Sequence, residues 1–207
     1  MNKTALLRTL ILTTIVVLGQ PLLAADKAEA QGKDAGPSEE KMMKKWEAAA
    51  APGAGHKALD ALAGEWEIVN KTWMAPDAPP LETKAKCTTR WILGGRYLQD
   101  DFDGEFMGKP MKGLGLTGYD NLKKKYNRLW IDSGGTGMST SEGTASADGK
   151  SFTFTGKMDD PMTGEKDKPP KYTNTIQIVS QDKHIFEMFY LSGGKSVKMM
   201  EMVYTRK

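Results

Sequence analysis

The residues best suited to chemistry in this sequence of 207 residues include a run of carboxylates between residues 100 and 105. A hard cation such as calcium requires several oxygen ligands that converge on one point. On an extended strand, Asp101, Asp103 and Glu105 instead point to one side in a line, as on a solvent-facing surface. The same alternation places Asp100 on the opposite, apolar face. We therefore predict no metal site here and regard Asp100 as a candidate ligand contact.

A second candidate set lies in residues 126–133, where Arg128 and Trp130 share one face. Apolar residues occupy the other face as well, so alternation does not decide which of the two faces points inward. Polar residues inside a barrel are costly unless they are paired, and they therefore mark contacts to a ligand. Arg128, Trp130 and Asp100 are thus candidate ligand-binding residues. The alternative is a buried salt bridge between Arg128 and an internal carboxylate, which implies no function.

Catalytic motifs are not apparent in the sequence. It contains no Gly-x-Ser-x-Gly elbow, no phosphate loop and no spaced Ser, His and Asp set. Glu187 and Glu201 lie in segments whose inward face is undecided, and no spacing singles out a pair of carboxylates for acid–base work. The single cysteine, Cys87, excludes a disulfide scaffold and is predicted to be a small buried hydrophobe. His56 is predicted to be exposed at the start of a short helix.

Ten strand-like segments must position these residues, and turn signals such as Gly94-Gly95 separate them. The segments span residues 65–74, 83–93, 96–106, 112–119, 126–133, 138–147, 151–158, 172–180, 184–191 and 196–206. Because no helix lies between them, a nucleotide-binding α/β fold is excluded and an up-and-down antiparallel meander is favoured. Closure into a barrel leaves no unpaired edge. We predict an all-β domain over residues 56–207, a barrel of about ten antiparallel strands with a short N-terminal helix.

The first 24 residues have the pattern of a secretory signal peptide. Two basic residues precede an apolar run at residues 10–18, which is shorter than the roughly 20 apolar residues of a membrane-spanning helix. Cleavage is expected after Ala24, or else after Ala25 or Ala30. We predict bacterial export to the periplasm or the extracellular space, with no stable membrane insertion after cleavage.

Residues 25–55 are predicted to form a flexible linker that contains a short amphipathic helix at residues 39–51. Met42, Met43 and Trp46 form an apolar stripe, which we expect to dock on the chain's own domain. The net charge is +3, or +1 without the two basic residues of the signal peptide. A nearly neutral chain exerts no long-range attraction on nucleic acid or on an anionic membrane, so neither is an expected partner.

The pattern Gly64-Glu65-Trp66, which follows a helical turn and opens the first strand, resembles the lipocalin and calycin superfamily. That resemblance implies that Trp66 closes one end of the barrel and stacks against an arginine near the end of the chain. Arg206 occupies the corresponding place. Gly64, Trp66 and Arg206 are therefore expected to form the closed end of the barrel.

Longer stretches look like a bacterial family of exported proteins, domain-of-unknown-function family 1579. They lie at residues 91–98, 118–121, 130–132, 141–144 and 204–206. The resemblance extends over residues 56–207 and implies a calycin-like barrel. Since the family has no assigned activity, catalytic residue or ligand, the resemblance implies none for this chain.

Some calycin-like barrels hold haem through one histidine, which directs attention to His184. It shares a face with Phe186, Met188 and Tyr190, and a porphyrin would accept these neighbours. His184 nevertheless directly follows the turn at residues 181–183, a position typical of a rim residue. We therefore predict no haem ligation and no other cofactor.

The sequence favours an exported, non-enzymatic protein that binds a small apolar ligand inside its barrel. Methionine, of which there are 13, suits adaptable apolar pockets. Because successive turns of a meander alternate between two ends, the connections with Met107, Met111 and Met162 gather at the open end, where we expect ligand contacts. The alternatives are an enzyme that acts on a hydrophobic substrate through internal carboxylates, and a filled barrel that serves as a structural or interaction module.

Overall fold

The computed structural model of the protein describes residues 38–75, 77–158, 171–192 and 195–207. Three helices come first: α1 (Glu39–Ala50), α2 (Ala54–Lys57) and the 3-10 helix η1 (Asp60–Leu62). Ten strands follow: β1 (Gly64–Thr72), β2 (Leu81–Ile92), β3 (Tyr97–Phe106), β4 (Lys109–Asp120), β5 (Lys125–Asp132), β6 (Ser139–Ala145), β7 (Ser151–Lys157), β8 (Lys171–Ser180), β9 (Lys183–Ser192) and β10 (Lys195–Arg206). Each strand overlaps one of the ten predicted segments.

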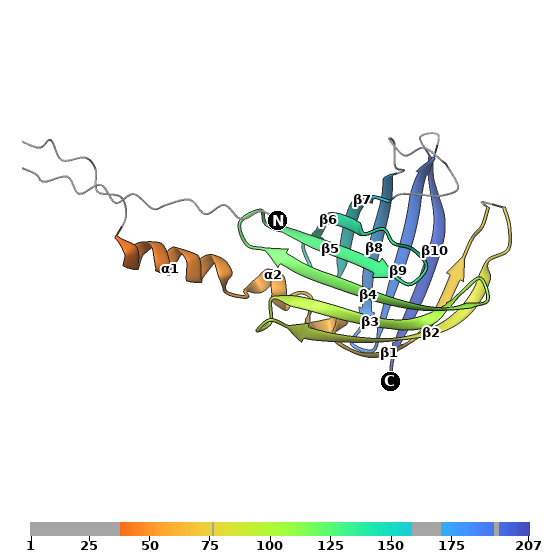
Figure 1. The fold of residues 1–207 in the computed structure, drawn as a ribbon, viewed down its shortest axis with the longest axis horizontal. Helices are drawn as coiled ribbons and strands as arrows, with labels where there is room; N and C mark the ends of the chain where they lie inside the picture. The colour runs from red at the N-terminus through yellow and green to blue at the C-terminus, as the bar shows by residue number, and fades with distance from the viewer. Residues whose placement is uncertain (1–37, 76, 159–170, 193–194) are drawn as a thin grey trace, which may run out of the picture. The chain divides into compact units, whose positions relative to one another are not determined.

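The ten strands form one closed barrel. Every strand pairs antiparallel with its neighbour along the chain, and β10 returns to pair with β1. Figure 1 shows the strands following one another round the barrel in chain order. The predicted fold class is therefore confirmed. Closure satisfies the backbone groups that an open sheet would leave unpaired at its edges.

Alternation along the strands decides which side chains fill the interior. On β1, Trp66 and Ile68 are buried, whereas Glu65 and Glu67 beside them are exposed. The buried core is largely aromatic and aliphatic, with Leu59, Leu62, Trp66, Ile68, Leu98, Phe102, Tyr126, Phe152, Phe154, Ile176 and Phe186 among its members. Each such side chain contributes about 1.5–3 kcal/mol when fully buried. Cys87 lies in this core as a buried free thiol, as predicted.

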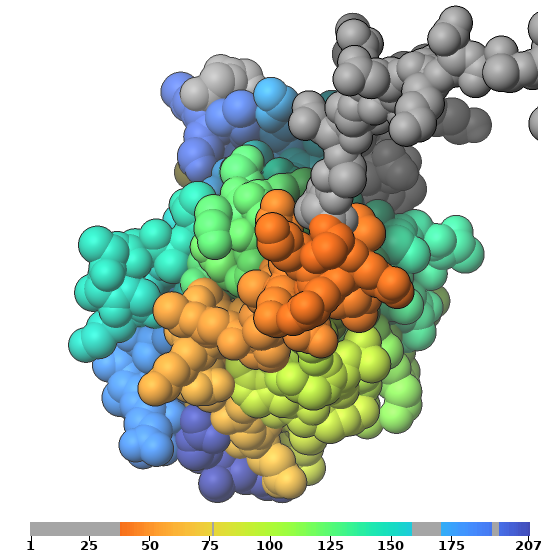
Figure 2. Space-filling view, turned by 90° about the vertical axis from the view of Figure 1, so that its left-hand side faces the viewer, coloured from red at the N-terminus to blue at the C-terminus, as the bar shows by residue number. Residues whose placement is uncertain are grey.

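The helical residues 54–62 cover one end of the barrel. In Figure 2, orange atoms of residues 38–62 lie in front of the yellow and green atoms of the strands. His56 is 5% exposed, and its ring meets the Tyr119 ring edge-on at 5.9 Å. Its Nδ1 accepts a hydrogen bond from the backbone N–H of Gly53 at 3.1 Å. The prediction that His56 is exposed is therefore wrong, because the segment folds back over the barrel.

Two tryptophan side chains fasten this cover to the strands. Trp66 Nε1 donates to the backbone carbonyl of Leu62 at 3.0 Å. Trp91 Nε1 donates to the Asp60 carboxylate, also at 3.0 Å. Residues 54–62 therefore belong to the barrel domain and mark its closed end.

The turns of the meander divide between the closed end and the opposite end, which we call the mouth. At the closed end, Gly95 (φ 82°) faces Pro52, and Gly149 (φ 68°) faces Ala58. Glycine adopts such positive φ values without the strain that a side chain would add. The connections β1–β2, β3–β4 and β5–β6 consequently lie at the mouth, as the alternation of turns predicts.

Helix α1 does not dock on the barrel, contrary to expectation. All its residues except Ala49 are exposed, and Trp46 is 71% exposed. Its end is held by Asn121, whose Nδ2 donates to the carbonyls of Ala49 and Ala51 at 2.8 Å. The closed end is already covered by residues 54–62, so the apolar stripe of α1 has no barrel surface to bury, and α1 extends away from the strands (Figure 1).

The expected signal peptide lies outside the described residues. Within the described part of the chain, no helix combines the length and the apolar character needed to span a membrane.

Candidate functional site

Arg206 ties the closed end together. Its guanidinium carbon lies 4.3 Å from the centroid of the Trp66 ring, and the two residues are direct partners across β1 and β10. Its Nη atoms donate to the carbonyls of Ala63 at 2.9 Å and Ala61 at 3.2 Å. Its Nε lies 3.3 Å from the carboxylate of Asp182. The contact predicted between Trp66 and Arg206 is present.

Gly64 makes room for this contact. Its φ of 148° is one that side chains rarely adopt, and a Cβ at this position would collide with Nη1 of Arg206. A glycine two residues before Trp66 therefore lets the guanidinium cross over the indole. This gives the Gly-x-Trp pattern a steric reason in this chain.

The polar face of β5 points into the barrel. Tyr126 is 5% exposed, whereas Ile131 on the other face is 37% exposed. Arg128 shares the face of Tyr126, and its guanidinium lies over the Phe186 ring at 4.9 Å. Trp130 is on the same face. The structure thus decides between the two orientations that alternation along this segment leaves open.

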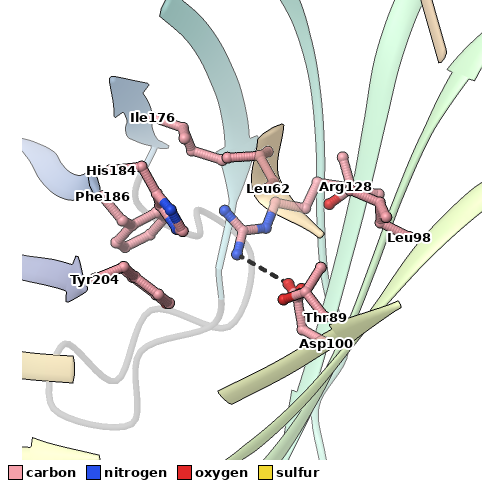
Figure 3. Close-up of a pocket in the computed structure, with 10 residues that line it drawn as sticks. Leu62, Thr89, Leu98, Asp100, Arg128, Ile176, His184, Phe186 and Tyr204 are labelled. Atoms are coloured by element: carbon pink, nitrogen blue, oxygen red, sulfur yellow. Dashed lines mark hydrogen bonds and ion pairs between the residues drawn. The ribbon is translucent and has the colours of Figure 1, made fainter. Parts of the chain in front are cut away.

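Asp100 and Arg128 form an ion pair inside the barrel. Arg128 Nη2 lies 3.7 Å from Asp100 Oδ2, and the two side chains are 11% and 18% exposed. Thr89 Oγ1 donates to Asp100 Oδ1 at 2.8 Å. Figure 3 shows the Arg128 guanidinium between Asp100 on one side and His184 on the other. The internal salt bridge that the sequence allows as the alternative to a ligand contact is therefore present, and Thr89 is a partner that the sequence does not indicate.

Two glycines on the inward face of β4 accommodate the site. A Cβ on Gly115 would lie 2.7 Å from Asp100 Oδ2, and a Cβ on Gly113 would overlap the ring of Trp130. Their spacing of two places both on one face of a strand. In the sequence, two glycines spaced in this way on one strand indicate that bulky or charged side chains lie beside them inside the barrel.

His184 is a buried residue of the closed end rather than a rim residue. It is 7% exposed, its ring stacks on Tyr204 with centroids 4.1 Å apart, and it meets Trp66 edge-on at 4.4 Å. Burial, together with the charges of Arg128 and Arg206, lowers the pKa of His184 to about 3. The imidazole is therefore neutral near pH 7. The rim prediction is wrong because Arg206 draws the turn before β9 against the helical cover.

A cavity of about 30 Å³ adjoins the Arg128 guanidinium and the His184 ring. Its lining consists of Leu62, Thr89, Leu98, Asp100, Thr117, Arg128, Ile176, His184, Phe186 and Tyr204. This volume holds one or two water-sized groups, and sites for drug-sized ligands are about ten times larger. A porphyrin therefore does not fit beside His184.

Two polar atoms of this lining have no hydrogen-bond partner within the part of the chain that the structure describes. They are Nη1 of Arg128 and Nδ1 of His184, and both are buried. A buried polar atom without a partner costs about 1–3 kcal/mol. Thr89, Asp100, Arg128 and His184 together form the polar centre of the barrel. Two atoms of this polar centre are thus free to form further hydrogen bonds.

The mouth half of the barrel is more open than the closed half. The inward-facing side chains of Met111, Trp130 and Met188 are only half-buried, whereas Phe152 and Phe154 are completely buried. Trp130 Nε1 donates to the Asp132 carboxylate at 2.7 Å, which holds the indole inside the barrel. Solvent therefore reaches the interior from the mouth side of the ion pair.

The methionines predicted as ligand contacts do not form one group. Met111 faces inward on β4 and packs against the core. Met107 lies at the β3–β4 turn and is 59% exposed, so the structure does not bring it to the polar centre. Met162 lies outside the described residues.

Glu187 and Glu201 lie on the outer face of the barrel, which alternation along the sequence left undecided. Both pair with Lys198, at 2.5 Å and 2.8 Å. Their inward neighbours on the same strands, Phe186 and Met202, are buried. These two carboxylates are therefore not part of the interior.

The acidic run on β3 also faces outward, except for Asp100. Asp101 pairs with Arg90, and Asp103 pairs with Lys112 at 3.1 Å. Over the described ranges, no group of three or more His, Cys, Asp or Glu side chains is placed to hold a metal ion. The carboxylates of this run act as surface charges.

A larger hollow of about 480 Å³ lies on the outside of the barrel. Its lining consists of Tyr97, Leu116, Asn127, Arg128, Leu129, Thr140, Ser141, Glu142 and Thr155. Most of these residues lie on the outward faces of strands β3 to β7. The hollow is a surface depression whose carboxylate, Glu142, already pairs with Lys123 at 3.4 Å and Lys125 at 3.5 Å. The interior, with its unpartnered polar atoms, is the stronger candidate site.

Comparison with known structures supports the barrel fold. Rv2717c from M. tuberculosis is similar with a TM-score of 0.56 and 15% identity over 76% of this chain and 99% of that chain. The S-type phycobiliprotein lyase CPES from Guillardia theta is similar with a TM-score of 0.51 and 11% identity over 75% of this chain and 98% of that chain. At these identities the likeness concerns the fold alone.

Comparison of the sequence with curated proteins found no match. The sequence does match one protein-family model, over residues 51–206. That family is described as proteins of unknown function, DUF1579. Because the match covers most of the chain and includes every strand of the barrel, the protein belongs to the DUF1579 family.

Proposed function

We propose that the protein binds a small, largely apolar ligand in the mouth half of its barrel. The observation that carries this proposal is the contrast in burial along the interior. Phe152 and Phe154 fill the closed half completely, while Met111, Trp130 and Met188 line the mouth half and stay half-buried. Half-exposed apolar side chains on a concave inner surface are what a ligand of this class would cover.

The rim of the mouth supports the same function. Large apolar side chains at or next to the mouth connections are exposed, namely Met74, Leu81, Phe106, Met107, Met138 and Leu191. More of these side chains lie at the mouth than at the closed end, where Leu93, Leu122 and Val179 are exposed. A group of exposed apolar residues marks a site of interaction more often than residues scattered singly. Methionine is frequent among them, and its flexible thioether adapts to ligands of differing shape.

Binding accounts for the interior better than catalysis does. The inward-facing carboxylates on the described strands are Asp100 and Asp132, and each already has a partner. Asp100 pairs with Arg128 and accepts from Thr89, and Asp132 accepts from Trp130. These contacts give both carboxylates a structural role in the interior, which supports binding over acid–base catalysis.

We also propose that binding takes place outside the cytoplasm, in the periplasm or the extracellular space. The support is the signal-peptide pattern of residues 1–24, a basic start followed by a short apolar run. Cell fractionation and N-terminal sequencing of the mature protein test this part. A mature chain that still begins at Met1 would overturn it.

The binding proposal is tested with N-phenylnaphthylamine, a neutral apolar dye that becomes fluorescent in apolar sites. The full mature chain is expected to bind it, and Met111→Asn is expected to weaken binding about fivefold through the lost apolar contact. Leu122→Asn, at an exposed closed-end turn (78% exposed), is the matched control and should bind as the wild type does.

Isotope-labelled methionine methyl groups locate the dye by NMR. Shifts at Met111 and Met188 are expected, with none at Met42 or Met43 on α1. An absence of binding, or shifts restricted to α1, would overturn the proposal.

A further inference from the structure

The polar centre of the barrel presents an incomplete hydrogen-bonding arrangement. Arg128 Nη1 and His184 Nδ1 are both buried, and neither has a partner within the described residues. Both side chains line the same cavity, and His184 is more than nine-tenths buried. A guanidinium N–H is always a donor, whereas a neutral imidazole has one donor and one acceptor nitrogen.

The size of the cavity limits what can complete this arrangement. About 30 Å³ accommodates a group the size of one or two water molecules. One or two oxygen atoms fit this space, while a ring or a larger branched group does not. The polar end of a ligand at this site is therefore small.

The charge of the site is already balanced. Asp100 lies 3.7 Å from Arg128 and carries the one negative charge that a guanidinium needs. Arg206, the other cation near His184, is matched by Asp182 at 3.3 Å. A ligand carboxylate would place a second anion beside Asp100 in a poorly solvated interior, which is unfavourable.

A hydroxyl group has the hydrogen-bonding capacity that both unpartnered atoms require. Its oxygen can accept from Arg128 Nη1 while its proton is donated to His184 Nδ1. If His184 carries its proton on Nδ1, the same oxygen accepts from both residues. A hydroxyl oxygen has two lone pairs, so it fits either tautomer.

We infer that the ligand ends in an uncharged hydroxyl group that binds between Arg128 and His184, and that Asp100 selects against carboxylates. This inference rests on the proposed function and adds the chemical class of the ligand, an apolar alcohol. Asp100 on β3 and Trp130 on β5 both pair with Gly115 of β4, so the three residues form one row across the sheet. This row lies one step nearer the mouth than the row that contains Arg128. The apolar part of the ligand therefore extends past Trp130 to the mouth.

The experiment compares decanol with decanoate, which have the same chain length and differ in their polar end. Binding of each is measured by displacement of N-phenylnaphthylamine from the wild-type chain, and decanol is expected to bind about tenfold more tightly. Asp100→Asn removes the competing negative charge and leaves Arg128 without an ionic partner. This variant is expected to reverse the preference, so that decanoate binds more tightly than decanol.

Asp103→Asn is the matched control, because it makes the same change on the outer face of the same strand. Asp103 pairs with Lys112 and is well exposed, so this variant should keep the preference for decanol. Wild-type protein that binds both compounds equally, or binds decanoate better, overturns the inference while binding itself remains established.

An Asp100→Asn variant that folds but keeps the wild-type preference also overturns the inference. Binding of the dye without displacement by either compound overturns it too. Failure of the dye to bind overturns the proposed function together with this inference. If Asp100→Asn does not fold, Arg128→Gln takes its place, and it is expected to weaken decanol binding about tenfold.

Discussion

The Arg206 guanidinium lies over the Trp66 indole, with 4.3 Å between its central carbon and the ring centroid. The same guanidinium donates to the carbonyls of Ala61 and Ala63 before β1, and to the carbonyl of Gln181 between β8 and β9. One side chain from the last strand therefore joins three separate parts of the closed end. The Trp66 ring is the apolar surface against which the guanidinium packs while it makes these hydrogen bonds.

Trp66→Ala is expected to lower the free energy of unfolding by about 3–5 kcal/mol, because a buried indole is replaced by a cavity. The change also removes the surface that Arg206 covers. Urea unfolding measures the loss. Trp46→Ala is the matched control, since Trp46 is 71% exposed on α1, and it should change stability by less than about 0.5 kcal/mol. Equal effects of the two substitutions would contradict the assigned packing.

Gly115→Ala is expected to destabilise the protein by about 1–3 kcal/mol through overpacking. The added methyl group would lie 2.7 Å from Asp100 Oδ2, so Asp100 must move relative to Arg128. Gly137→Ala places a methyl group where no atom lies within 4 Å, and serves as the control. Thermal unfolding of both variants checks the expectation. If the two variants melt at the same temperature, Gly115 has no such steric role.

His184 makes the stability depend on pH in a defined direction. Burial lowers its pKa from 6.5 to about 3, so between these values the unfolded chain binds a proton that the folded chain does not. The stability contributed by the neutral imidazole is complete above pH 6.5 and is lost as the pH falls towards 3. The slope is at most about 1.4 kcal/mol per pH unit.

His184→Phe removes this group while keeping a ring that stacks on Tyr204. Urea unfolding at several pH values below 6.5 should show a shallower loss of stability for the variant than for the wild type. Subtracting the two curves cancels the contributions of other titrating groups. Parallel curves for the two proteins would show that His184 titrates normally in the folded state.

Removal of residues 1–50 is expected to leave the melting temperature within about 2 °C of the full chain. No residue of α1 is buried, and the helix is attached through hydrogen bonds from Asn121. Removal of residues 1–62 is the informative comparison, because it also removes Leu59 and Leu62, which are 0% and 6% exposed. This longer truncation should lower the melting temperature strongly, and an equal effect of both truncations would argue against the described packing.

The strand order follows from the sequence because local chemistry marks each boundary. Turn residues such as Gly94 and Gly95 stand between segments of regular alternation, and every one of the ten segments has a counterpart in the barrel. The face of β5 does not follow from the sequence in this way. Tyr126 and Ile131 are both apolar enough to face inward, and only the closed sheet decides between them.

The candidate site was predictable in part. Alternation places Asp100 inward, and a salt bridge with an internal carboxylate is one of the two outcomes that the sequence allows for Arg128. The positions of His56 and His184 were not predictable. Each histidine lies next to a turn or a short helix, a position that is usually exposed to solvent. Each is buried by residues that are distant in the sequence, His56 by Tyr119 and His184 by Trp66. The cover exists only once residues 54–62 pack on the strands.

The pairing of β1 with β10 has a consequence for the order in which the barrel forms. The first strand finds its second partner only when residues near the very end of the sequence are available. As the chain folds, β1 to β9 can line up as a meander, but its two outer strands stay open until β10 pairs with them. A contact of such long range delays completion of the fold. The barrel is therefore expected to close last, after the meander has formed, with a holdase chaperone able to occupy the open strands until then.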